Sequence, residues 1–360
     1  MRDFIVETLN MIFQGILEMV VGYLWSLASP ILERHPSILA AIPGLAEDRG
    51  AVYGSLAAKF STMLYLGEAH SFRELLKNRI VKLSIVYGFL SGLFVVLLAG
   101  LVSTPLDALV YFLVSRGISL TVLIPLTAFL TVLAFRKGLN VDLIVVSLIT
   151  VIADLISAIS IFLTFNVIGV PFMIITLTLF IIALNELKVK GKSKKEYAIS
   201  VLTASTISTM AGMVLAESGA ASNKALLAAA PLVMALNGSA SMNFASWLGT
   251  ALALGEVDPK RPFNMALAKT WLRVTVESLI GVGVSTALFS TSLGIKPMVF
   301  ALVSTVVLRI LMPLISIAIS CTSFLKGWDP DLITIPLTSS LNDFISTTTL
   351  TIVALTLNWV

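Results

Sequence analysis

Apolar stretches long enough to cross a membrane recur along almost the whole of this 360-residue chain. A span needs roughly 20 apolar residues, and about eleven such stretches follow one another with short connections between them. Hydrophobic residues make up 57% of the chain and charged residues 12%, a composition typical of a protein mostly immersed in lipid. The sequence therefore predicts an all-α polytopic protein of the cell membrane, with no room for a separate soluble domain.

The distribution of basic residues predicts how the chain is oriented in the membrane. Lysine and arginine gather in alternate connections, near residues 73–79, 136–137, 188–195 and 260–269. The opposite connections, at 31–36, 104–117, 167–169, 218–224 and 293–297, carry only Arg34, Arg116, Lys224 and Lys296. By the positive-inside rule the first set is cytoplasmic, so the N-terminus lies inside and the C-terminus outside. This pattern explains the net charge of +4 without a nucleic-acid partner.

The chain contains an internal repeat. Residues 135–157 match residues 324–346 without a gap, at an offset of 189, and both segments carry an aspartate within an apolar stretch, Asp154 and Asp343. A second match, of 39–68 with 227–256, has an offset of 188. Because the two offsets nearly agree, the repeat covers a whole unit rather than one helix.

Each repeat holds about five predicted spans. They are 8–30, 37–67, 80–103, 118–135 and 141–166 in the first repeat, and 196–217, 225–254, 271–292, 298–322 and 331–358 in the second. The expected division is a first repeat at 1–167, a linking helix with a basic loop at 168–195, and a second repeat at 196–360. Since five crossings reverse the side of the membrane, the extra segment at 170–187 makes the repeats parallel. A pseudo-two-fold axis along the membrane normal then relates them.

The two mid-span aspartates indicate a cation site. A carboxylate at the bilayer centre costs about 2.5–3.5 kcal/mol on insertion scales, so a duplicated one is expected to have a function. The axis between parallel repeats brings Asp154 and Asp343 across one pathway. Magnesium prefers one or two carboxylates with retained water, and the nearby polar residues Ser339, Ser340, Asn342 and Thr150 offer oxygen atoms for an outer cage. With two histidines and one cysteine in the chain, a dedicated zinc or copper site is not expected, whereas manganese, cobalt and calcium remain open.

Glycine and proline occur within the long second span of each repeat. The first copy has Pro43 and Gly50, and the second has Pro231 followed by Asn237 and Gly238. Irregular backbone at membrane depth is tolerated only where it is buried in protein or lines a wet cavity. Two interpretations stay open, a broken helix beside the pathway and an ordinary kinked helix.

Other interpretations of the charged residues also remain. Each aspartate could cap a helix break or pair with a basic residue such as Arg309, and Arg273 with Glu277 is expected to form a local pair. His35 and His70 are expected to be interfacial connection residues rather than ligands. Two intramembrane aspartates are also the equipment of an aspartyl protease, but the neighbouring residues of such proteases are absent. A non-transporting scaffold would leave the aspartates unexplained.

The second repeat carries a recognisable signature at 329–343. It begins Asp329-Pro330, has a mid-helix Pro336 and continues to Asp343. This segment resembles the fifth span of the magnesium transporter family typified by bacterial MgtE, and Asn237-Gly238 is similar to that family's glycine-asparagine segment. The duplicated arrangement resembles most closely the two-unit relatives in solute carrier family 41.

The resemblance implies a transporter, not an enzyme, that works as a single-chain pseudo-dimer in the lipid bilayer. In this family the fifth-span aspartates of two parallel five-span units hold a hydrated magnesium ion in a central pore. This role is implied for Asp343 directly and for Asp154 through the repeat, with the carbonyl groups of Ser339 and Thr150 one turn earlier. No cofactor is implied beyond the transported ion. The pattern departs from the family at Ile335, Val146, Ser147 and Arg49.

Overall fold

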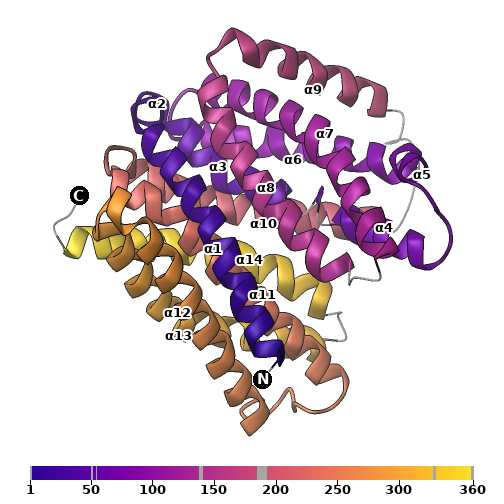
Figure 1. Cartoon of the computed structure of the whole chain (residues 1–360), viewed down its shortest axis with the longest axis vertical. Coiled ribbons are helices and arrows are strands. Elements are labelled where there is room, and N and C mark those ends of the chain that lie inside the picture. The colour runs from indigo at the N-terminus through magenta and orange to yellow at the C-terminus, as the bar shows by residue number, and fades with distance from the viewer. Residues whose placement is uncertain are drawn as a thin grey trace. The chain divides into compact units, whose positions relative to one another are not determined.

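The protein is all-helical throughout the residues that the computed structural model describes, which are 2–49, 52–53, 55–137, 141–184, 193–326 and 330–357 (Figure 1). The helices are α1 (Arg2–Leu27), α2 (Ser29–Arg34), α3 (Pro36–Arg49), α4 (Ser55–Tyr65), α5 (Phe72–Lys77), α6 (Arg79–Ala99), α7 (Pro105–Arg136), α8 (Val141–Leu163), α9 (Val170–Ala183), α10 (Ser193–Glu217), α11 (Lys224–Ala253), α12 (Met265–Leu293), α13 (Lys296–Leu325) and α14 (Pro330–Thr356). Short 3-10 turns lie at Val167–Gly169 and Ala220–Ser222. The prediction of an all-α protein is confirmed.

Five helices within the described ranges are long and apolar enough to cross a membrane. They are Arg79–Ala99, Pro105–Arg136, Lys224–Leu252, Met265–Leu293 and Lys296–Leu325, and two shorter apolar helices lie at Ile149–Leu163 and Val167–Ala183. This supports a multi-pass membrane protein. The predicted total of about eleven spans stays a prediction.

The chain forms two compact units that do not follow its order. The α11 unit consists of Met1–Glu33 together with Thr206–Val360, and the α7 unit consists of Arg34–Ser205. Helix α1 therefore packs with the helices of the second sequence repeat. The boundary between the units falls within α10. The predicted repeat limits concern matches in the sequence, and they stay a prediction.

Helix α11 is the common packing partner in the α11 unit, where it contacts α1, α12, α13 and α14. Gly15 and Gly22 lie two turns apart on one face of α1. A methyl group on Gly22 would overlap the carbonyl oxygen of Ala228 in α11, and one on Gly15 would overlap the hydroxyl of Ser285 in α12. The two glycines thus let α1 pack tightly against both helices.

Helix α7 has the corresponding place in the α7 unit, where it contacts α4, α6, α8 and α9. Helix α9 lies along α6 and α7 through apolar rings and one hydrogen bond. The rings of Phe89 and Phe180 stack with centroids 3.8 Å apart, and the Thr176 hydroxyl donates to the Leu113 carbonyl at 2.7 Å. On its other side α9 exposes large apolar residues such as Ile174 and Ile181. That exposure suits a lipid environment.

The predicted connection at 104–117 is wrong, because α7 already begins at Pro105. A proline fits the first turn of a helix, where its missing N–H has no partner to lose. Arg116 is consequently a buried residue within α7, 3% exposed, and its guanidinium lies 5.6 Å from the centroid of the Phe112 ring. Arg116 therefore does not lie in a connection between spans, and it does not count among the basic residues that the positive-inside rule compares.

Of the two interpretations of the stretch around Asn237 and Gly238, the broken helix is wrong, because α11 is continuous from Lys224 to Ala253 with Pro231 inside it. Polar side chains in this stretch bond within the helix instead of interrupting it. The Asn237 amide donates to the Val233 carbonyl at 2.9 Å, and the Ser241 hydroxyl donates to the Asn237 carbonyl at 2.7 Å. In the first copy α3 and α4 are separate helices, and Gly50 lies outside the described residues.

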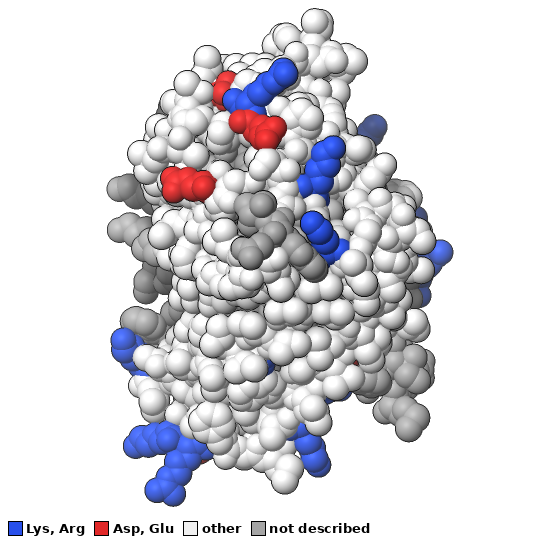
Figure 2. Space-filling model, turned by 90° about the vertical axis from the view of Figure 1, so that its left-hand side faces the viewer, with Lys and Arg blue, Asp and Glu red and all other residues white. Residues whose placement is uncertain are grey.

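Charged side chains are sparse on the face drawn in Figure 2, where uncharged residues cover broad areas between them. Large apolar side chains are exposed on several helices, among them Leu97, Leu272 and Ile310. A water-soluble protein rarely exposes apolar area on this scale. The surface therefore agrees with the composition in indicating a protein surrounded by lipid.

We expect Gly22→Ala to move α1 away from α11, because the added methyl group overlaps the Ala228 carbonyl oxygen. Overpacking of this kind costs about 1–3 kcal/mol, which thermal unfolding of the detergent-solubilised chain would detect. Gly283→Ala in α12 is the matched control, since its nearest neighbouring atom would lie 4.0 Å from the new methyl carbon. Equal destabilisation by both changes would contradict the close packing of α1.

Candidate functional site

Asp343 lies half-buried on α14 among buried polar side chains of the α11 unit. Ser339, one turn earlier on the same face, is also half-buried, whereas Ser340 and Asn342 are fully buried. The hydroxyl of Ser208, on α10, donates to Oδ2 of Asp343 at 3.0 Å. A second helix therefore orients this carboxylate.

Asn342 connects α14 to α11. Its Nδ2 donates to the Met234 carbonyl at 2.9 Å, and a methyl group on Gly238 would lie 3.4 Å from the same nitrogen. Because an amide nitrogen donates and a carbonyl accepts, this bond fixes the orientation of the side chain. Oδ1 of Asn342 is buried and has no hydrogen-bond partner within the described residues.

Asn237 of α11 shows the same pattern toward α13. Its Nδ2 donates to the Val233 carbonyl at 2.9 Å and to the Thr305 hydroxyl at 3.0 Å, while its Oδ1 is buried without a partner in the described part of the chain. A buried acceptor of this kind ordinarily bonds to water or an ion. Amide oxygens are ligands that suit magnesium and calcium.

One interpretation of the sequence was that an aspartate pairs with Arg309 of α13. The hydrogen bonds of Arg309 go to other groups. Its Nη2 donates to the Asn237 carbonyl and to the Ser241 hydroxyl, both at 2.9 Å. Both acceptors belong to α11. The arginine is 2% exposed, so this charge is held in the interior of the α11 unit.

The first aspartate lies in the α7 unit. Asp154 and Thr150 are half-buried on α8, one turn apart. Ser157, three residues after Asp154, forms a 2.6 Å hydroxyl contact with Tyr111 of α7. Since Asp154 and Asp343 belong to different compact units, their predicted meeting across one pathway stays a prediction.

The sequence predictions did not include two buried polar residues of the α11 unit, Ser208 on α10 and Glu18 on α1. Ser208 belongs to a stripe of small buried polar residues on α10 that also includes Ser205 and Thr209, and this spacing could have revealed it. Glu18 is 1% exposed at the middle of α1, between Gly15 and Gly22. A lone carboxylate in a predicted span was the signal for Glu18.

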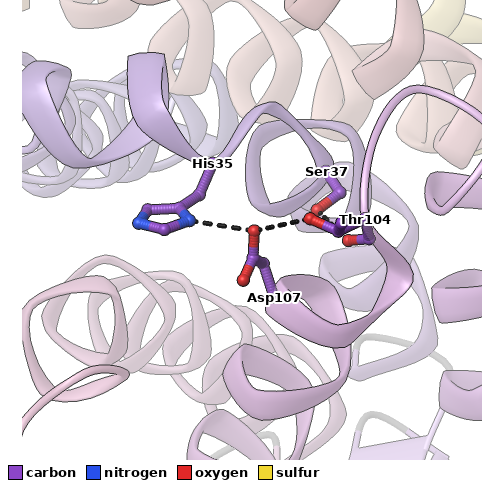
Figure 3. Close-up of polar contacts among 4 residues, drawn as sticks. All are labelled: His35, Ser37, Thr104 and Asp107. Atoms are coloured by element: carbon purple, nitrogen blue, oxygen red, sulfur yellow. Dashed lines mark hydrogen bonds and ion pairs between the residues drawn. The ribbon is translucent and has the colours of Figure 1, made fainter.

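A separate polar group in the α7 unit connects the start of α7 to the connection between α2 and α3 (Figure 3). Nδ1 of His35 lies 2.9 Å from Oδ2 of Asp107, the Thr104 hydroxyl donates to that oxygen at 2.9 Å, and the Ser37 hydroxyl donates to the Thr104 carbonyl at 2.8 Å. This arrangement uses His35 to hold a connection in place.

The predicted pair of Arg273 and Glu277 is confirmed on α12, with Nε and Oε1 2.9 Å apart, and Arg273 also bonds to Glu7 of α1. Within the ranges that the structure covers, no three histidine, cysteine, aspartate or glutamate side chains cluster in a way that could hold a metal ion. Asp343 and its polar neighbours on α14 and α10 offer instead one carboxylate, hydroxyl groups and an amide. Such a set suits a hard, hydrated cation.

Comparison with known proteins gives one family. The sequence model of the family described as MgtE, divalent cation transporter, matches residues 42–165 and again residues 230–353. The two matches span more than half of the chain, start 188 residues apart, and each contains one of the mid-span aspartates. No curated protein and no solved structure matches the chain.

We expect Ser208→Ala to destabilise the α11 unit by about 1.5–3 kcal/mol, the usual worth of a hydrogen bond to a charged group. Thermal unfolding in detergent measures the loss. Thr203→Ala is the control, because Thr203 lies on the same helix but is exposed. If both variants unfold at the wild-type temperature, the Ser208 hydroxyl does not hold Asp343.

Proposed function

Because the chain belongs to the MgtE family of divalent cation transporters, we propose that it carries magnesium across the membrane along a pathway between its two repeats. The observation that carries the proposal is the carboxylate of Asp343 and the polar residues that neighbour it on α14 and α10. A half-buried carboxylate stands on α14, and a serine hydroxyl from α10 orients it. The preceding residue, Asn342, has a buried amide oxygen without a partner in the described part of the chain. The transported ion is the substrate, and no cofactor is required.

The chemistry of these groups favours a hydrated ion. Magnesium loses its water reluctantly and is usually held by one or two carboxylates and retained water molecules. Asp343 supplies one charge, and Asp154 supplies the second in the proposed pseudo-dimer. Asn342, Ser339, Ser340 and Thr150 would bond to the water around the ion. The same oxygen set accepts manganese, cobalt or calcium, so selectivity rests on size and hydration.

The pathway is proposed to lie on the axis between parallel repeats. Asn237 and Gly238 belong to α11, which contacts the aspartate-bearing α14, and they are proposed to line the pathway with Gly50 as their counterpart. An axis along the membrane normal would bring both aspartates to one depth. Two carboxylates there would together offset the cost of moving a strongly hydrated divalent cation to mid-membrane.

We expect Asp343→Asn and Asp154→Asn each to reduce magnesium flux about tenfold or more, because removing one charge removes about half of the electrostatic compensation in a low-dielectric pathway. The double variant should show the flux of empty vesicles. Magnesium-sensitive dye inside proteoliposomes measures the rate. The Asp343 change should be the more damaging, because the second repeat retains Pro336 and the serines near its aspartate.

Asp258→Asn is the matched control for these variants, since it removes an exposed carboxylate from the connection between α11 and α12. It should transport at the wild-type rate. All variants are checked for a single monodisperse peak before reconstitution. Wild-type flux in a folded double variant would remove both aspartates from the proposed site.

The proposed orientation predicts which connections face outward. Single cysteines replace Arg34, Arg73, Ser222 and Arg261, all exposed, in a Cys321→Ser background. An impermeant maleimide added to intact cells should label positions 34 and 222 and spare 73 and 261. Each labelled position belongs to the same connection of its repeat, as parallel repeats require. Labelling at 34 and 261 instead would mean inverted repeats and would end the proposed pathway on the axis.

A further inference from the structure

Arg309 is a permanent positive charge in the interior of the α11 unit. It stands in the middle of α13 and is 2% exposed. Arginine remains charged in proteins, and a buried charge in a membrane helix is costly enough that a functional role is the first expectation.

The hydrogen bonds of Arg309 satisfy only part of its guanidinium. Nη2 donates to the carbonyl of Asn237 and to the hydroxyl of Ser241, both on α11. Nε and Nη1 are buried without a hydrogen-bond partner within the described residues. The carbonyl and the hydroxyl that accept these hydrogen bonds are uncharged, so they do not neutralise the positive charge of Arg309.

Arg309 and Asn342, the residue before Asp343, bind neighbouring carbonyl groups of α11. Arg309 binds α11 at Asn237, and Asn342 binds α11 at Met234. These two positions are three residues apart, an axial rise of about 4.5 Å along the helix. Asn342 immediately precedes Asp343 in α14. Helices α13 and α14 therefore bind the same turn of α11. Helix α13 does so through the Arg309 guanidinium, and α14 through the amide of Asn342, the residue before Asp343.

We propose that Arg309 is a positioning and affinity-setting residue of the cation site, which fixes the Asn237 turn of α11 and lowers the affinity of Asp343 for a divalent cation. The proposal rests on the proposed function of Asp343. The positive charge of Arg309 repels the bound cation, because the protein interior screens charges poorly. A transported ion must bind firmly enough to enter and weakly enough to leave, and a fixed positive charge nearby provides the second condition.

The position matching Arg309 in the first repeat is Leu120, at the offset of 189. The α7 unit buries Arg116 instead, one helical turn earlier on the same face of α7. The environment of Arg116 differs, because its guanidinium lies near the Phe112 ring. We therefore expect affinity control to depend on Arg309 in the second repeat.

The test compares magnesium affinity and transport in variants of the full chain. Arg309→Gln removes the charge, and Arg309→Lys keeps it. Titration calorimetry of the detergent-solubilised protein with magnesium chloride should show about tenfold tighter binding for Arg309→Gln and about wild-type binding for Arg309→Lys. In proteoliposomes the Gln variant should saturate at lower magnesium and turn over more slowly, because the ion leaves more slowly. Arg273→Gln is the control for an equal change in net charge, since Arg273 is neutralised by Glu7 and Glu277.

A second variant covers the case in which Arg309→Gln does not fold. Ser241→Asp places a carboxylate within hydrogen-bond distance of the guanidinium and neutralises it without removing it. It should also tighten magnesium binding, and the uncharged Ser241→Asn should not. A purely structural role of Arg309 predicts weaker binding in the charge-removing variants, and that result, or unchanged affinity, would overturn the proposal. If wild-type protein carries no divalent cation, the proposed function itself fails.

Discussion

Hydrogen bonds between buried polar side chains and α11 are the interaction on which the α11 unit depends. At membrane depth lipid offers no hydrogen-bond partner, so a buried polar side chain is stabilised by bonds within the protein. Asn342 from α14 and Arg309 from α13 each donate one such bond to a carbonyl group in one stretch of α11. The same bonds link α13 and α14 to α11, and the oxygen of Asn342, the residue before Asp343, is buried without a partner within the described residues. Packing and the proposed chemistry therefore have a common cause.

The two units solve the same packing problem with different parts. In the α11 unit the second predicted span is one continuous helix, and polar side chains return their bonds to the helix itself. In the α7 unit the corresponding stretch is divided between α3 and α4. The buried arginines also differ, because Arg309 bonds to α11 whereas Arg116 lies near an aromatic ring.

The sequence predictions succeeded where a single physical rule controlled the outcome and failed where two rules competed. The length of apolar stretches predicted helices, and the spacing of Arg273 and Glu277 predicted their pair. Residues 104–117 were expected to form a connection, yet α7 begins at Pro105 and contains Arg116, which is buried near the Phe112 ring. Glycine and asparagine at 237–238 left a broken and a kinked helix both open, and α11 is continuous there, with side-chain bonds to the preceding carbonyl groups.

The sequence by itself determined that the chain lies in lipid, that it is helical, that it contains a repeat and that each repeat carries a mid-span aspartate. These features follow from local composition and from an offset that can be read along the chain. Two matches to a divalent cation transporter family agree with that reading. Only the tertiary structure decided that α1 joins the helices of the second repeat, that Ser208 holds Asp343, and that Arg309 binds α11. These contacts join residues far apart in the chain, and their energies depend on which helix faces pack together. No local pattern of residues specifies that choice.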